Sequence, residues 1–256
     1  MSDLFSIRGK VAVVTGGSRG IGLMIARGFV RHGARVYISS RRKDVCDRIA
    51  TELSAEGSCV SLPADLSTEA EARRLAREIG AREAALHILV NNAGATWGAP
   101  LAEYPESAWD KVLAINVKAV FHLTQVLLPL LEKGGRPGDP ARVINIGSID
   151  GLRVPLFESY AYSASKAAVH HLTRALAVRL AAHGVTVNAI APGPFESKMM
   201  AETLSQFRDA IVAACPLGRI GEPEDMAGTA IFLASRAGAY LTGTVIPVDG
   251  GLSIRP

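Results

Sequence analysis

The fold of this 256-residue chain is decided by Val11-Ala12-Val13-Val14-Thr15-Gly16-Gly17-Ser18-Arg19-Gly20-Ile21-Gly22. The apolar residues at its start predict a buried strand, and the glycines after them predict a tight turn into a helix. Such a turn lets a pyrophosphate approach the backbone N–H groups at the start of the helix, whose dipole favours an anion. Small residues here also serve helix–strand packing, so dinucleotide binding and packing both remain possible at this point.

Short apolar runs alternate with longer amphipathic stretches along the rest of the chain. The amphipathic stretches predict helices near residues 21–32, 43–55, 68–82, 107–131, 160–183 and 223–235, with polar starts such as Ser67, Ser107 and Glu222 followed by Pro223. The short runs, mostly β-branched, predict strands buried on both faces at 11–14, 36–38, 60–62, 88–90, 143–146, 185–190 and 245–248. This alternation predicts an α/β fold, a Rossmann-type doubly wound domain whose seven-stranded parallel sheet has helices on both faces.

We expect residues 1–256 to form one domain. The Gly- and Pro-rich stretch 134–140 resembles a linker, but the strand pattern resumes directly after it, which favours an exposed loop. Residues 194–216 interrupt the alternation with about twenty residues before the next regular helix. We interpret this insertion as a loop that covers a substrate site.

Composition places the chain among globular proteins, with 48% hydrophobic and 20% charged residues. Its net charge of +4 comes from 28 basic and 24 acidic residues, which are dispersed except at Arg41, Arg42 and Lys43. This pattern argues against nucleic acid and favours one small anionic ligand.

Cysteine and histidine usage argues against disulfides and metal. The three cysteines are far apart and predict reduced thiols in a cytoplasmic protein, and the six histidines show no ligand spacing. Residues 1–9 show no signal pattern, and no apolar run approaches the roughly 18 to 20 residues that span a bilayer. We therefore expect no metal and no membrane contact.

A Tyr-x-x-x-Lys spacing joins Tyr162 to Lys166, fourteen residues after Ser148. On a helix this spacing puts the phenol and the ammonium on one face, where the cation favours the ionised phenol. Taken alone, the spacing also fits an ordinary solvated helix face.

The spacing Gly16-x-x-x-Gly20-x-Gly22 resembles that of the short-chain dehydrogenase/reductase family, and most closely the bacterial β-ketoacyl reductases. The resemblance covers the whole chain, through Asp65, Asn91-Asn92-Ala93-Gly94, Asn116, Ser148, Tyr162, Lys166, Pro192-Gly193 and Val248-Asp249-Gly250-Gly251. It implies cofactor contacts from Gly16, Ser18, Arg19, Gly20, Ile21, Gly22, Ser40, Arg41, Asp65, Leu66, Asn92, Ala93, Gly94, Tyr162, Lys166, Pro192, Gly193, Phe195 and Ser197.

The end of the second predicted strand favours NADP(H) over NAD. Ser40 stands where NAD-dependent relatives usually carry an aspartate for the ribose hydroxyls, and Arg41 follows it. Arg19 matches a basic residue of many NADP-dependent relatives. Asp65 is implied to face the adenine, with helix capping as its alternative role.

The resemblance also implies a catalytic set: Asn116, Ser148, Tyr162 and Lys166. Tyr162 would give its proton to a substrate carbonyl, Ser148 would donate a hydrogen bond to the same oxygen, and Lys166 would lower the pKa of the phenol. Asn116 would hold a water that connects Lys166 to solvent. The alternatives are a helix-distorting role for Asn116 and a strand-end cap for Ser148.

The segment after the sixth predicted strand departs from the common family pattern Pro-Gly-x-x-x-Thr. Here it is Pro192-Gly193-Pro194-Phe195-Glu196-Ser197. Ser197 keeps the hydroxyl, Phe195 replaces an aliphatic contact, and Pro194 stiffens the loop.

Substrate contacts are expected from Ser148, Tyr162, Trp97, Phe157 and Tyr160, within a mostly apolar pocket that adds Asp150, Val154, Met199, Met200 and Phe207. An apolar pocket favours a small-molecule ketone or a 3-oxoacyl thioester, whose carrier could be acyl carrier protein. The alternatives are a polyol, sugar or steroid alcohol dehydrogenase and, from another class, a dinucleotide sensor without turnover. Resemblance further implies a homotetramer, with interfaces at the helices near 107–131 and 160–183 and at the C-terminal strand.

Overall fold

Seven parallel strands form one sheet, described in a computed structural model for residues 4–155 and 157–254. The strands are β1 (Val11–Thr15), β2 (Arg35–Ser39), β3 (Ser58–Ser61), β4 (Ile88–Asn91), β5 (Ala141–Ile146), β6 (Val185–Pro192) and β7 (Val245–Val248). Their order across the sheet is β3-β2-β1-β4-β5-β6-β7. All seven predicted strands are present, and the seven-stranded parallel sheet is confirmed.

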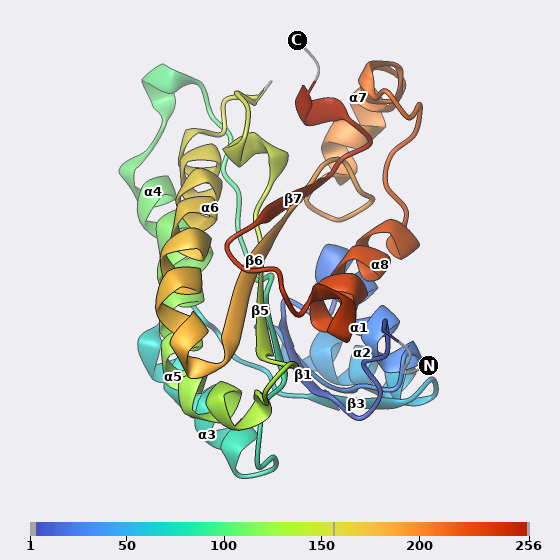
Figure 1. Ribbon diagram of the computed structural model, residues 1–256. Helices are drawn as coiled ribbons and strands as arrows, with labels where there is room; N and C mark the ends of the chain where they lie inside the picture. Colours follow the sequence, from blue (N-terminus) through green and yellow to red (C-terminus); the bar gives the residue numbers. More distant parts are fainter. Residues whose placement is uncertain (1–3, 156, 255–256) are drawn as a thin grey trace.

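Helices cover both faces of the sheet (Figure 1). They are α1 (Gly20–Arg31), α2 (Lys43–Ser54), α3 (Glu69–Gly80), α4 (Glu106–Leu113), α5 (Ala119–Gly134), α6 (Tyr160–Leu180), α7 (Ala201–Ala214) and α8 (Pro223–Ala234). α8 begins at the predicted Glu222 cap with Pro223 in its first turn, whereas the cap of α3 is Thr68 and not Ser67.

Two hydrophobic cores result, one on each face. Ala12 and Val14 of β1 lie in the core with α1, α2 and α8, while Val11 and Val13 lie in the core with α3, α5 and α6. Successive side chains of a strand point to opposite faces, so a strand buried on both faces reads as a continuous apolar run.

Two elements differ from the sequence prediction. The helix expected at 107–131 consists of α4 and α5, joined by a π-helical turn over Ala114–Lys118. The segment 194–216 carries helix α7 and is not wholly a loop. Leu204, Phe207 and Ile211 stand at the spacing of an amphipathic helix, so the sequence did carry a helical pattern here that the prediction missed.

The continuous helical stretch from Glu106 to Gly134 is long and apolar enough to cross a membrane, by length and composition alone. The expectation that no apolar run reaches this length was therefore wrong. Leu123, Leu127 and Leu131 on this stretch are buried in the core under β4 and β5. A core helix passes the same test, and 39% of the most apolar window of this stretch is buried.

Candidate active site

The strand order reverses between β1 and β4, and the predicted site residues gather at this end of the sheet. Thr15, Asn91 and Ile146 each close a strand at the carboxyl edge, and the glycine turn, the Asn92-Ala93-Gly94 turn and Ser148 follow them. In open α/β sheets, ligands bind in the crevice at such a switch point.

The glycine turn is shaped by the close approach of Asn92. The Asn92 side chain donates to the Thr15 carbonyl at 2.8 Å, and the Thr15 hydroxyl accepts from the backbone of Asn92 and Ala93. A Cβ at Gly22 would lie 2.3 Å from Nδ2 of Asn92, and Gly16 has φ +64°. Only glycine fits these two positions, which leaves the backbone at the start of α1 open to a ligand.

The adenosine side of the crevice carries two unpaired arginines. Arg42 and Lys43 form ion pairs with Asp44 and Asp47, whereas Arg19 and Arg41 have no acidic partner among residues 4–155 and 157–254. Asp65 is exposed and accepts from the backbone N–H of Ser67 at 3.2 Å. Its carboxylate therefore has a turn-capping contact, and its outer oxygen faces solvent.

Tyr162, Lys166 and Ser148 come together as predicted. The Lys166 Nζ lies 5.5 Å from the centre of the Tyr162 ring and donates to the Ile146 carbonyl at 2.8 Å. The Ser148 hydroxyl hydrogen-bonds the Tyr162 phenol and also accepts from the backbone N–H of Asp150 at 3.1 Å. The loop after β5 and the first turns of α6 thus place a phenol, a hydroxyl and an ammonium at one point.

The pKa of the Tyr162 phenol differs from the expectation that Lys166 would lower it. Burial raises the pKa of Tyr162 to about 12, the hydrogen bond from Ser148 opposes this rise, and the negative charge of Asp150 adds to it. Burial lowers the pKa of Lys166 to about 8. Desolvation is therefore the largest influence on the pKa of the phenol, and it keeps Tyr162 protonated.

Asn116 lies in the π-helical turn, directly beside this group. Its amide donates to the Ala95 carbonyl at 3.0 Å and to the Ser165 hydroxyl at 2.9 Å, and its oxygen accepts from the Ala95 backbone at 2.8 Å. Gly94 packs close to both Asn116 and the Lys166 ammonium. Because both N–H groups of its amide are used, Asn116 anchors the turn, and only its carbonyl oxygens are left to accept a hydrogen bond from water.

His170 belongs to the site's support and was not singled out from the sequence. It is 2% exposed, and its only hydrogen-bonding contact among the residues that the structure describes is to the backbone of Gly151. Its ring fills the space left by Gly147 and Gly151 on either side of Ser148, where a Cβ at Gly147 would lie 2.1 Å from Nε2. The adjacent histidines at 170 and 171 were the only sequence signal.

The segment after β6 lies across the glycine turn. A Cβ at Gly20 would lie 3.2 Å from the Ser197 Cβ, so Ser197 is close to the start of α1. Phe195 is 2% exposed and packs in the core against Gly221, so its ring does not face the crevice. Of the predicted contacts here, Pro192 ends β6, Gly193 follows it, Ser197 lies beside Gly20, and the Phe195 ring is turned into the core.

Tyr104 links Trp97 to Tyr160 in an aromatic wall. Tyr104 was not among the residues predicted from the sequence. The Tyr104 hydroxyl donates to the Trp97 carbonyl at 3.3 Å, and its ring packs edge-on against Tyr160 at 5.3 Å. The Tyr160 hydroxyl donates to Glu158 at 2.6 Å and so points away from Tyr162. Opposite this wall, Phe157 meets Phe207 of α7, with ring centres 5.8 Å apart.

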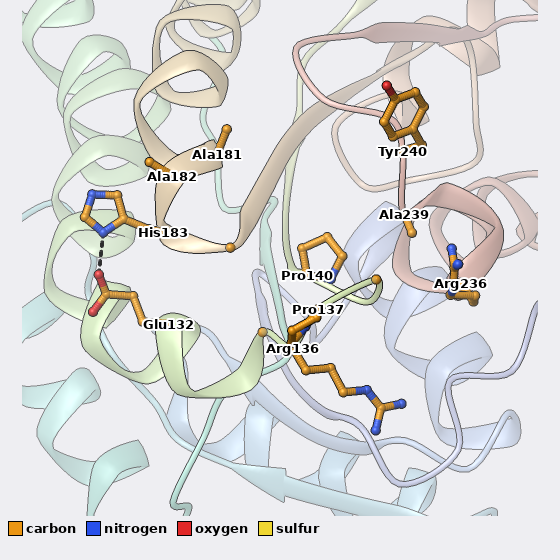
Figure 2. Close-up of a pocket in the computed structure, with 13 residues that line it drawn as sticks. Glu132, Arg136, Pro137, Pro140, Ala181, Ala182, His183, Arg236, Ala239 and Tyr240 are labelled. Atoms are coloured by element: carbon orange, nitrogen blue, oxygen red, sulfur yellow. Dashed lines mark hydrogen bonds and ion pairs between the residues drawn. The ribbon is translucent and has the colours of Figure 1, made fainter.

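A separate cavity of about 620 Å³ opens at the other end of the sheet, before β5 and β6. Figure 2 shows its wall, where His183 and Glu132 point toward each other and Tyr240 and Arg236 stand on the opposite side. None of the predicted catalytic residues lines it. In parallel sheets this amino-terminal edge is not where ligands usually bind.

The residues of the crevice fit NADP(H). The first turn of α1 holds no acidic side chain, its N-terminal Gly20 has φ +52°, and Arg19 immediately before it makes no capping hydrogen bond. These features suit a pyrophosphate, and the unpaired Arg19 and Arg41 suit a 2′-phosphate.

The chain belongs to the short-chain dehydrogenase/reductase family. The family profile described as "Enoyl-(Acyl carrier protein) reductase" matches residues 16–253. The chain is 52% identical, over 99% of its length and 100% of the relative's, to a rhamnolipids biosynthesis 3-oxoacyl-[acyl-carrier-protein] reductase of Pseudomonas aeruginosa.

Two solved structures are similar throughout. A Pseudomonas aeruginosa RhlG/NADP active-site complex superposes with a TM-score of 0.96 at 52% identity, covering 99% of this chain and 100% of that one. A Burkholderia cenocepacia gluconate 5-dehydrogenase in complex with NADP and tartrate superposes with a TM-score of 0.91 at 32% identity, covering 99% of both chains. The protein is thus an NADP(H)-dependent oxidoreductase acting on CH–OH groups, and not a sensor without turnover.

Proposed function

We propose that this enzyme reduces 3-oxoacyl thioesters to 3-hydroxyacyl thioesters. The observation that carries the proposal is an apolar rim of exposed side chains on the segments that follow Ser148 and β6, where Phe157 contacts Phe207; its members are Leu152, Val154, Phe157, Met199 and Phe207. Such a rim suits an acyl chain better than a polyol. The full-length similarity to a 3-oxoacyl-[acyl-carrier-protein] reductase supports the same substrate class.

The chain's own residues would handle the proton while bound NADPH supplies the hydride. Tyr162 would transfer its phenolic proton to the substrate oxygen, and its raised pKa keeps that proton on the phenol until the reaction. Ser148 would donate a hydrogen bond to that oxygen as negative charge develops on it. Lys166 would hold positive charge beneath the phenol and help to replace its proton.

The substrate proposal is tested by NADPH oxidation with a panel of ketones. We expect turnover of acetoacetyl and longer 3-oxoacyl thioesters and little with 5-ketogluconate. A panel in which only keto-sugar acids react would favour the second candidate, a sugar-acid dehydrogenase, which the similarity to gluconate 5-dehydrogenase supports.

The proton donor is tested by Tyr162→Phe. We expect NADPH to bind with unchanged affinity while the reduction rate falls by about 10²- to 10⁴-fold, the usual contribution of a general acid. Tyr160→Phe is the matched control, because that hydroxyl pairs with Glu158. A full rate in the Tyr162 variant would refute the assigned role.

We also propose acyl carrier protein as a carrier and the cytoplasm as the location. Arg208 lies next to Phe207 of the apolar rim and pairs with Glu196, and Arg153 follows Leu152 of the same rim, so both lie beside the proposed substrate site in sequence. Arg136 lies at the opposite edge of the sheet, in the wall of the second cavity, and serves no such docking. Cys46, Cys59 and Cys215 are free and buried, as suits a reducing compartment.

A further inference from the structure

Asp150 is a half-buried carboxylate beside the proton donor that the reaction scheme does not use. It lies in the short 3-10 turn Ile149–Gly151, directly after Ser148. Among the described residues, its side chain makes no hydrogen bond or ion pair. A carboxylate removed from water without a partner is unfavourable, so its retention here calls for a partner that arrives with the substrate.

The turn that carries Asp150 is firmly held. The Asp150 backbone N–H donates to the Ser148 hydroxyl at 3.1 Å, and Ile149 is buried. Gly151 is pressed against α6, where a Cβ would lie 2.7 Å from both the Lys166 carbonyl carbon and the Ala167 nitrogen. The carboxylate therefore keeps a fixed position relative to Tyr162 and Ser148.

Arg153 places a positive charge near Asp150 but does not contact its carboxylate. Arg153 lowers the pKa of Asp150, but burial is the larger effect and raises it, and the two side chains form no ion pair. The Arg153 guanidinium is directed instead to the Leu252 carbonyl, at 3.4 Å. Leu152 and Val154, which follow in the chain, are apolar and exposed, and the Tyr162 phenol is close enough for its pKa to be raised by the Asp150 charge.

The chemistry of the Asp150 carboxylate limits which group of the substrate can bind it. An ionised carboxylate only accepts hydrogen bonds, so it cannot serve the reacting carbonyl oxygen, which needs donors. An acyl chain has no N–H or O–H group. In a 3-oxoacyl thioester, the donors are on the arm beyond sulfur, whose amides carry N–H groups.

We propose that Asp150 is a specificity-determining residue that accepts a hydrogen bond from an amide N–H on the thioester arm of the substrate. The inference rests on the proposed function. It also means that a substrate carboxylate near this point is rejected by like charge, a repulsive element that disfavours keto-sugar acids.

The test uses two substrates that differ only in the donor. They are the thioesters of 3-oxobutanoate with N-acetylcysteamine, which has an amide N–H, and with 2-mercaptoethyl acetate, which has an ester oxygen there. We expect the wild-type enzyme to prefer the amide by about tenfold in kcat/KM, the usual scale for a hydrogen bond to a charged group. Asp150→Ala should lose this preference through a higher KM for the amide alone, and Asp150→Asn, a neutral acceptor, should keep part of it.

Asp110→Asn is the control, because Asp110 is an exposed carboxylate on α4. This variant should leave kcat/KM unchanged for both thioesters. Thermal unfolding should show Asp150→Ala to be no less stable than the wild type, because it removes an uncompensated charge. Equal losses on both thioesters, or an unchanged preference, would overturn the inference alone. Failure of the wild type to reduce either thioester would overturn the proposed function and this inference with it.

Discussion

Tyr162 and Lys166 lie one helical turn apart, and burial acts on both in the direction of the neutral form. The pKa of the phenol rises to about 12 and that of the ammonium falls to about 8. The spacing in the sequence suggested mutual stabilisation of two charges, but desolvation is the larger effect in the free protein. The pair is consequently set for proton donation to a ketone.

His170 should make the stability of the protein depend on pH. Burial lowers its pKa to about 4 from the ordinary 6.5, and the Gly151 backbone opposes this in part. In the unfolded chain the His170 imidazole therefore becomes protonated below pH 6.5, whereas in the folded chain it becomes protonated only near pH 4. Stability is lost as the pH falls through this window, by about 2 kcal/mol between roughly pH 7.5 and pH 5.

Urea unfolding of His170→Leu at both pH values checks this. The variant should lose that part of the pH dependence, whereas His171→Leu, at the exposed neighbouring position, should keep it. An identical pH dependence in the His170 variant would contradict the assignment.

Arg41 should set the preference for NADPH over NADH. It has no acidic partner among the described residues and follows Ser40 at the end of β2. Arg41→Asp should raise the KM for NADPH by about tenfold or more, the value of a charge-assisted phosphate contact, and lower that for NADH. Arg42→Gln is the control, since Arg42 is paired with Asp44; an unchanged cofactor ratio in Arg41→Asp would rule out the role.

At the scale of elements, β1, the glycine turn and α1 form one unit with the Asn92 turn. The π-helical turn between α4 and α5 is tied to the same unit, because Asn116 holds the Ala95 backbone on both its N–H and its carbonyl. π-Turns inside helices are frequent at functional sites. Here the turn fixes the loop after β4 beside Lys166.

Gly22→Ala should disrupt this unit. The new Cβ would lie 2.3 Å from the Asn92 amide and 2.4 Å from the Gly16 carbonyl oxygen, so backbone has to move. We expect NADPH affinity to fall by at least about tenfold and unfolding to occur at a lower temperature. Gly228→Ala in α8 meets no atom within 4 Å and should instead stabilise the protein by about 0.5–1 kcal/mol. Calorimetry and NADPH titration of both variants test the contrast.

At the scale of the whole molecule, α4, α5 and α6 lie together on one side of the sheet (Figure 1). Trp109, Phe121 and Val178 on these helices are exposed, which is unusual for large apolar side chains in a lone chain. The sequence analysis placed an interface of a homotetramer on the same helices, and we retain that as a prediction.

Light scattering after size exclusion should give about 108 kDa, four copies of the 27.0 kDa chain. Phe121→Glu places a charge on a side chain that is 40% exposed and should yield smaller species. Thr51→Glu, on α2 at the other face of the sheet, should not. A wild-type mass of 27.0 kDa would refute the tetramer.

The local sequence pattern alone predicted the seven strands, the glycine turn and the Tyr162–Lys166 pair, because strand burial and helical spacing are periodic in sequence. The prediction missed α7, and the pattern did not predict the π-helical turn or the burial of the Phe195 ring. The last two features depend on contacts with residues far away in the chain, such as Gly221 for Phe195 and Ala95 for Asn116.

The sequence by itself determined the α/β class through its local pattern, and the resemblance of its motifs to a known family implied the NADP(H) preference and the residues available for proton transfer. Only the tertiary structure decided that Tyr162 is held protonated, that the buried His170 ring packs against the glycines on either side of Ser148, and that Asp150 stands uncompensated beside the phenol. The physical reason is desolvation: a pKa or an unmet hydrogen bond depends on which distant side chains exclude water, and residue order does not record this.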